Sequence, residues 1–174
     1  MAVISSNALT GITTRMADAG MSAGSILQTV QTVVSTHSFS TTSTSKTDIT
    51  GMSVAITPSS ANNKVLISTN LNYGGTYYSY YGFLLRGSTE LAIPSSGDNP
   101  CSFAICSLTT ANNNWELHDR DFMYLDSPNT TSATTYKLQI QCQSGGTWYL
   151  NRTSRNGSTD CVCSSTITAM EVAA

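Results

Sequence analysis

The sequence is short of charged residues. Asp, Glu, Lys and Arg make up 10% of its 174 residues, against roughly 25% in a typical globular domain. Low charge would also suit a disordered chain, but disordered chains usually combine few aromatic residues with a high net charge. This chain has eight tyrosines, four phenylalanines and two tryptophans, and its formal net charge is −2. We therefore expect a folded chain whose polar surface is made mainly of Ser, Thr, Asn and Gln.

Basic clusters and long apolar runs are missing as well. The eight lysines and arginines are scattered, so the basic patch of a nucleic-acid-binding protein is not expected. No apolar stretch approaches the ~20 residues that a membrane-spanning helix needs, so no membrane insertion is expected. The segment 1–11 lacks the basic and apolar regions of a secretory signal. These absences favour synthesis in a cytoplasm without an export signal.

The sequence also lacks the motifs of common enzymes. It has no nucleophile elbow, zinc-protease motif, phosphate-binding loop or EF-hand spacing. A polysaccharide hydrolase would need paired carboxylates, and glutamate occurs only at positions 90, 116 and 171. We expect no enzymatic activity, no catalytic residues and no cofactor.

The densest group of ionisable residues is Glu-Leu-His-Asp-Arg-Asp at 116–121. In an extended chain, the side chains at 116, 118 and 120 lie on one side and Asp119 and Asp121 on the other. The two aspartates could hold a hard cation, and His118 could act as a base. A polar sheet rim or loop with internal ion pairs is the favoured interpretation, so we predict no metal site.

The five cysteines are odd in number, which excludes a fully paired intrachain set. Cys161 and Cys163 would share one face of a strand. Neither this pair nor Cys101 with Cys106 has the spacing of common zinc sites. We interpret the cysteines, including Cys142, as small buried apolar residues, and whether any of them pair stays open.

From residue 26 onward, apolar and polar residues alternate as in half-buried strands. In 135–143, for example, Tyr136, Leu138 and Ile140 share one face, and Lys and Gln occupy the other. Two-residue hairpin turns are predicted at 87–88 and 145–146. Strands are predicted over 26–39, 48–57, 64–73, 81–86, 89–93, 102–108, 121–125, 135–143, 147–152 and 163–172.

This pattern predicts an all-β protein, an antiparallel jelly-roll-like sandwich of about 8–10 strands with a short N-terminal arm. Residues 1–25, rich in Ala, Gly, Ser and Met, form the predicted arm or anchor. Residues 26–174 form the predicted single β-sandwich domain.

Five of the eight tyrosines lie between positions 73 and 81. Tyrosine supplies flat amphipathic contact area at low entropic cost, so Tyr77, Tyr78 and Tyr80 are candidate contacts with a partner subunit or a glycan. The alternative is that Tyr73 and Tyr81 simply begin and end core strands. The tryptophans at 115 and 148 are expected to be strand or core residues.

Several segments, taken in order, resemble a β-rich domain of marine and cyanobacterial phage tail fibres and capsid decoration proteins. They are Thr-Asp-Ile-Thr-Gly-Met-Ser-Val-Ala-Ile-Thr-Pro-Ser-Ser at 47–60, Asn-Lys-Val-Leu-Ile at 63–67, Thr-Thr-Tyr-Lys-Leu-Gln-Ile at 134–140, Gly-Thr-Trp-Tyr-Leu-Asn-Arg at 146–152 and Ser-Ser-Thr-Ile-Thr-Ala-Met-Glu-Val-Ala at 164–173. The resemblance covers 26–174 and implies a jelly-roll-like sandwich that often trimerises. It supplies no catalytic residues, and neither 1–25 nor 73–81 matches it.

The resemblance implies an accessory virion subunit, a capsid decoration (cement) protein or short fibre. We expect a homotrimer that buries neutral surface between subunits, with the N-terminal arm bound to the major capsid protein or another virion protein. Such a subunit would be made in the host cytoplasm and end in the virion. The alternative is a receptor- or carbohydrate-binding tail fibre module that recognises a host surface glycan. Capsid or tail location and oligomer symmetry stay open.

Overall fold

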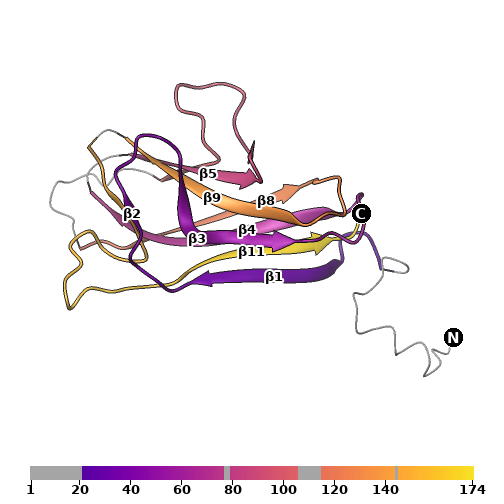
Figure 1. Ribbon diagram of the computed structural model, residues 1–174, viewed down its shortest axis with the longest axis horizontal. Helices are drawn as coiled ribbons and strands as arrows, with labels where there is room; N and C mark the ends of the chain where they lie inside the picture. Colours follow the sequence, from indigo (N-terminus) through magenta and orange to yellow (C-terminus); the bar gives the residue numbers. More distant parts are fainter. Residues whose placement is uncertain (1–20, 77–78, 106–114, 144) are drawn as a thin grey trace.

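The computed structural model describes residues 21–76, 79–105, 115–143 and 145–174. In these ranges the chain forms strands and no helix, so the predicted all-β class is confirmed (Figure 1). No helix there is long and apolar enough to cross a membrane. The strands are β1 (Ile26–Val34), β2 (Ser40–Thr41), β3 (Thr47–Ile56), β4 (Lys64–Gly75), β5 (Tyr80–Arg86), β6 (Thr89–Leu91), β7 (Phe103–Ile105), β8 (His118–Asp126), β9 (Thr134–Cys142), β10 (Trp148–Leu150) and β11 (Ser165–Val172).

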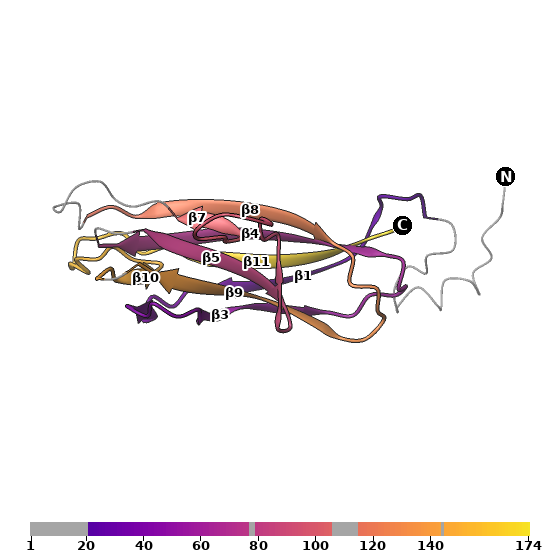
Figure 2. The same ribbon diagram turned by 90° about the horizontal axis from the view of Figure 1, so that it is seen from above.

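The strands form two antiparallel sheets packed face to face as an elongated sandwich (Figure 2). In the first, sheet A, the order is β1-β11-β4-β8. β10 pairs with the last residues of β4, on the same side of β4 as β11, and β2 pairs with β10. In the second, sheet B, the order is β3-β9-β5. On the other edge of β5, β7 pairs with its first part and β6 with its last part. Successive long strands alternate between the sheets, and the first strand pairs with the last. This is the strand order of a jelly roll.

The core lies between the sheets and follows the alternation of the sequence. In β4, Val65, Ile67, Thr69 and Leu71 are buried, and the residues that alternate with them (Leu66, Ser68 and Asn70) are partly exposed. In β9, the residues from Tyr136 to Cys142 alternate in the predicted way. Because one face of each strand is buried against the opposite sheet, a period of two residues fixes which side chains form the core.

One predicted turn is confirmed and the other is wrong. Gly87, with a φ of 59°, turns β5 back onto β6, and Arg86 pairs with Thr89. The segment 145–146 is not a hairpin turn, since β9 belongs to sheet B and β10 to sheet A. The chain passes there from one sheet to the other.

The first strand ends earlier than predicted, at Val34 rather than residue 39. The Asn151 side chain donates hydrogen bonds to the carbonyl oxygens of Val34 (2.7 Å) and Thr36 (2.9 Å). It also accepts one from the Ser165 hydroxyl at 2.6 Å. Asn151 thus joins the end of β1 to the start of β11. The predicted arm lies largely outside the described residues, and its anchoring role stays a prediction.

Candidate functional site

Of the three candidate contact tyrosines, Tyr77 and Tyr78 lie outside the described residues. Tyr80 lies in the core and is 1% exposed. Its hydroxyl lies 2.7 Å from the carbonyl oxygen of Thr76 and 2.8 Å from that of Thr147. Burial raises the pKa of Tyr80 to about 12. The contact role of this stretch stays a prediction.

The tyrosines that flank this stretch face different environments. Tyr73 is a core residue, and its ring stacks on Trp148 with centroids 6.1 Å apart. Tyr81 follows Tyr80 on β5, so its side chain projects from the opposite face of the strand and is half-buried. Tyr81 therefore presents an aromatic ring on the outer side of sheet B.

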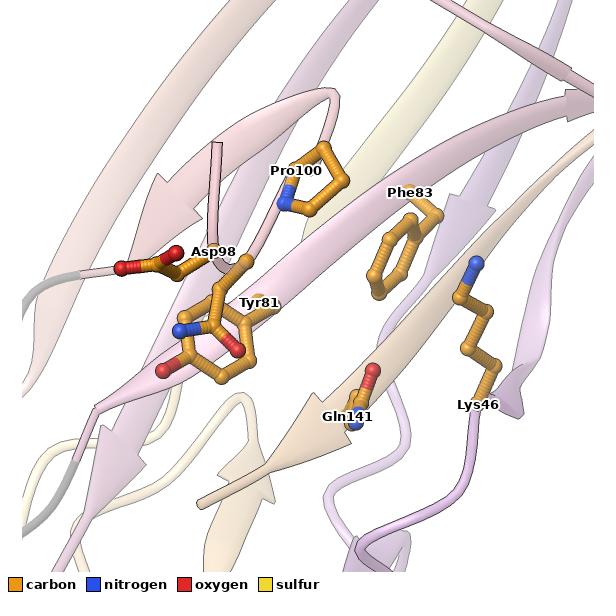
Figure 3. A pocket seen from close by; sticks show the side chains of 7 residues that line it. Lys46, Tyr81, Phe83, Asp98, Pro100 and Gln141 are labelled. Carbon is orange, nitrogen blue, oxygen red and sulfur yellow. The ribbon is translucent and has the colours of Figure 1, made fainter. Parts of the chain in front are cut away.

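A pocket of about 240 Å³ lies on this outer side (Figure 3). Its floor comes from β5 and β9, where Tyr81 pairs directly with Gln141. One wall is Lys46, just before β3, and the opposite wall is the loop 92–102 between β6 and β7. The lining residues are Lys46, Tyr81, Phe83, Asp98, Asn99, Pro100 and Gln141.

The loop 92–102 is fixed to the sheet at its C-terminal end. The Ser102 hydroxyl donates to the carbonyl oxygen of Leu91 (2.7 Å) and accepts from the backbone N–H of Leu84 (2.9 Å). The next residue, Phe103, packs its ring over Gly82, where an added Cβ would lie 2.1 Å from the ring. Only glycine leaves room for that ring. These contacts hold the loop beside the pocket floor.

The polar groups of the pocket fall into two kinds. Lys46 is engaged, because its ammonium forms an ion pair with Glu90 and lies 4.2 Å from the Phe83 ring centroid. The Gln141 amide nitrogen donates to the carbonyl oxygen of Thr44 (2.9 Å). By contrast, no described residue forms a hydrogen bond with the side-chain oxygen of Gln141 or with the side chains of Tyr81, Asp98 and Asn99. The pocket therefore combines aromatic surface with polar groups that face solvent.

The ionisable group at 116–121 forms the rim of sheet A. His118 Nε2 lies 3.2 Å from Glu116 Oε2, and the His118 ring stacks on Tyr73 at 5.6 Å. Asp121 accepts a hydrogen bond from Asn70 at 2.8 Å. No cluster of three metal-ligating side chains occurs in the described parts of the chain. The arrangement agrees with the polar sheet rim.

The predictions for cysteine and tryptophan are partly wrong. Cys142 is buried as predicted, but Cys161 and Cys163 are exposed because they precede β11 rather than lie on it. Trp148 is a fully buried core residue. Trp115 is 64% exposed, with the Arg155 guanidinium 3.4 Å from its ring centroid. No described cysteine is in a disulfide, and Cys106 lies outside the described residues.

A second surface of interest is the outer side of sheet A, which we call the neutral face. The registers of β8, β4, β11 and β1 align uncharged side chains in two neighbouring rows. Met123 and Leu125 at its β8 edge are 61% and 46% exposed. The rows are Leu125, Leu66, Met170 and Thr29, then Met123, Ser68, Thr168 and Gln31.

The neutral face is bordered by an open strand edge. β1 pairs with β11 on one side, and no described strand pairs with its other side. Its nine residues carry no charge, and Ile26, Val30 and Val33 are exposed. An uncharged, unpaired edge strand is a template for association with another chain.

No protein-family model and no curated protein matches the chain. The resemblance to phage structural domains therefore stays a prediction. Among solved structures, a similar chain comes from "Structure of infectious bursal disease virus Gx strain", with 16% identity and a TM-score of 0.38. The similarity covers 84% of this chain and 37% of that chain. A likeness this distant leaves the function open.

Proposed function

We propose that this chain is a structural subunit of a virus particle, an accessory capsid decoration protein or short fibre of a phage-type virion. The observation that carries the proposal is the neutral face, together with the open edge of β1. Apolar side chains as exposed as Met123 and Leu125, in a continuous uncharged surface, are typical of protein–protein interfaces. The fold supports the proposal by analogy, since jelly rolls build many viral capsid domains.

A sister copy is the proposed occupant of the neutral face. In a cyclic trimer each subunit presents two different surfaces, one to each neighbour. The neutral face and the β1 edge together supply one of them, and its core lacks the charges that would be costly to bury. Sheet B is less suited to this role, because its outer side carries the Asp48–Lys137 and Lys46–Glu90 ion pairs.

The proposed subunit acts by assembly rather than by catalysis. Each contact would add binding free energy only in the assembled state, which stabilises the particle. Among the described residues that line the sheet B pocket, Asp98 is the one carboxylate, whereas glycoside hydrolysis generally uses two. The N-terminal arm would bind a capsid or other virion protein, and the chain would be made in the host cytoplasm.

The test is the oligomeric state of the full chain in solution, measured by light scattering and native mass spectrometry. We expect a trimer, and we expect the double variant Met123→Lys and Leu125→Lys to be monomeric with an unchanged circular dichroism spectrum. Lysine charges in the interface would have to be buried or would repel. The matched control is Thr135→Lys, an exposed position on the outer side of sheet B, which should leave the trimer intact.

Two results would contradict the proposal. One is a wild-type chain that is monomeric at every concentration and does not bind purified particles that lack it. The other is a double variant that stays trimeric, which would place the interface elsewhere and remove the observation on which the proposal rests.

A further inference from the structure

The pocket on sheet B has features that assembly through sheet A does not use. The side chains of Tyr81, Asp98 and Asn99 make no hydrogen bond with another described residue, and neither does the side-chain oxygen of Gln141. Tyr81 and Gln141 are paired neighbours of β5 and β9, while Asp98 and Asn99 belong to the loop 92–102. Polar residues from distant parts of the chain thus line one pocket together with an aromatic ring, as in small-molecule sites.

We propose that this pocket binds a neutral saccharide, one sugar ring at a time. A pyranose ring has an apolar face of C–H groups and a rim of hydroxyls. The half-buried Tyr81 ring offers a flat amphipathic surface for the apolar face. The Asp98 carboxylate and the side-chain oxygen of Gln141 can accept hydrogen bonds from sugar hydroxyls, and the Asn99 side chain can both donate and accept. Figure 3 shows Tyr81 next to its paired neighbour Gln141, with Asp98 on the other side of Tyr81.

The charges of the pocket favour a neutral sugar over an anionic one. Asp98 is exposed and has no cationic partner among the described residues. Lys46, the cation among the residues that line the pocket, is already paired with Glu90. An incoming sulfate, phosphate or sugar carboxylate would meet an unpaired carboxylate without a free cation to offset it. Hydroxyl donors instead form charge-assisted hydrogen bonds with Asp98.

The size of the pocket limits the ligand. Its volume of about 240 Å³ is below the roughly 300–1,000 Å³ of sites that enclose drug-sized molecules. The pocket is also open to solvent, so a longer glycan could extend from it. A single hexose has about twelve non-hydrogen atoms, for which ordinary ligand efficiency corresponds to a Kd near 1 mM.

The experiment titrates the full chain with methyl glycosides of glucose, galactose and mannose and with N-acetylglucosamine, up to about 20 mM, well above the expected Kd. Binding is followed by saturation-transfer NMR and by chemical shifts. We expect at least one sugar to bind, and we expect Tyr81→Ala and Asp98→Asn each to weaken it at least ~10-fold. Matched controls outside the pocket are Tyr149→Ala and Asp119→Asn, which should bind like the wild type.

Three results would overturn the saccharide proposal. Asp98 is exposed and makes no hydrogen bond with another described residue, so Asp98→Asn should fold like the wild type. If this variant binds the sugar as tightly as the wild type, the proposal is overturned. Absence of binding by all four sugars would overturn it too, as would tighter binding of N-acetylneuraminic acid or inorganic sulfate than of any neutral sugar. The oligomeric state is measured in the same samples, so failure here is separate from failure of the assembly proposal.

Discussion

Two carboxylates in the molecule are held in similar ways but in different surroundings. Glu171, on the inner side of sheet A, is 1% exposed. Its oxygens accept hydrogen bonds from the Ser59 backbone N–H (2.6 Å) and hydroxyl (2.7 Å), Asn63 (2.8 Å) and Gln28 (2.5 Å). Asp48, on the outer side of sheet B, accepts from Lys137 (2.8 Å) and Gln139 (2.6 Å), and its side chain is 56% exposed.

Both carboxyl groups have lowered pKa values, but the balance of causes differs. Burial acts to raise the pKa of Glu171, and the hydrogen bonds from Asn63, Ser59 and Gln28 outweigh it. For Asp48, the hydrogen bonds from Lys137 and Gln139 lower the pKa with little opposition from burial. Water can replace the partners of Asp48 but not those of Glu171. Burial, rather than the number of hydrogen bonds, should therefore decide how much each network stabilises the fold.

The largest loss of stability is expected for Asn151→Ala. Asn151 is an uncharged residue with a buried hydrogen-bond network like that of Glu171, and it lies at the opposite end of β11. The substitution leaves the Val34 and Thr36 carbonyl groups and the Ser165 hydroxyl without their buried partner. It also places alanine at a φ of 60°. We expect the free energy of unfolding to fall by about 3 kcal/mol, measured by urea denaturation with tryptophan fluorescence.

The control for backbone strain is Asn129→Ala. Asn129 has a similar φ of 52° but is exposed, so only the conformational cost of ~1 kcal/mol is expected. Equal losses for the two variants would show that the buried hydrogen bonds of Asn151 contribute nothing beyond strain.

The next largest loss is expected for Glu171→Gln. The shape is kept, but the amide NH₂ takes the place of Oε2 and faces the Gln28 donor. The hydrogen bonds from Ser59 and Asn63 to the remaining oxygen are no longer charge-assisted. We expect the free energy of unfolding at neutral pH to fall by about 2 kcal/mol, measured in the same way. Glu90→Gln, at a surface ion pair, is the control and should change it by less than ~0.5 kcal/mol.

The pH dependence of stability should distinguish the wild type from Glu171→Gln. Because the pKa of Glu171 is lower in the folded than in the unfolded chain, its contribution is present above the unfolded value, near ~4.3. That contribution is lost as the pH falls through the folded pKa. Urea midpoints from about pH 6 to pH 3 should thus fall more steeply for the wild type than for Glu171→Gln. Parallel curves would contradict the lowered pKa.

The sequence predicts which strand residues are buried better than it predicts how exposed residues are arranged. The alternation in β9 places Tyr136, Leu138 and Ile140 on one face of the strand, and this face is buried. A strand with one buried face must follow this period. The prediction of a hairpin turn at 145–146 was wrong, because two glycines indicate a change of chain direction but not which sheet the next strand joins.

The pocket could not be predicted, because its residues come together only through long-range pairing. The Tyr81–Gln141 register joins β5 to β9, and Lys46 arrives from before β3. The one local signal is Gly-Asp-Asn-Pro at 97–100, a polar segment between two predicted strands where binding residues often occur. Cys161 and Cys163 were misplaced for a similar reason, since composition does not show where β11 begins.

The smallest effect is expected for Asp48→Asn, which makes the same chemical change as Glu171→Gln in an exposed network. The asparagine carbonyl oxygen can still accept from Lys137 or Gln139, and water can satisfy whichever donor is released. We expect the free energy of unfolding to change by less than ~0.5 kcal/mol, measured by urea denaturation at low and high salt. A loss as large as that of Glu171→Gln would show that burial does not govern these networks. It would also weaken the case for sheet A as the associating side, because the ion pair on the outer side of sheet B would then stabilise the fold as much as a buried network does.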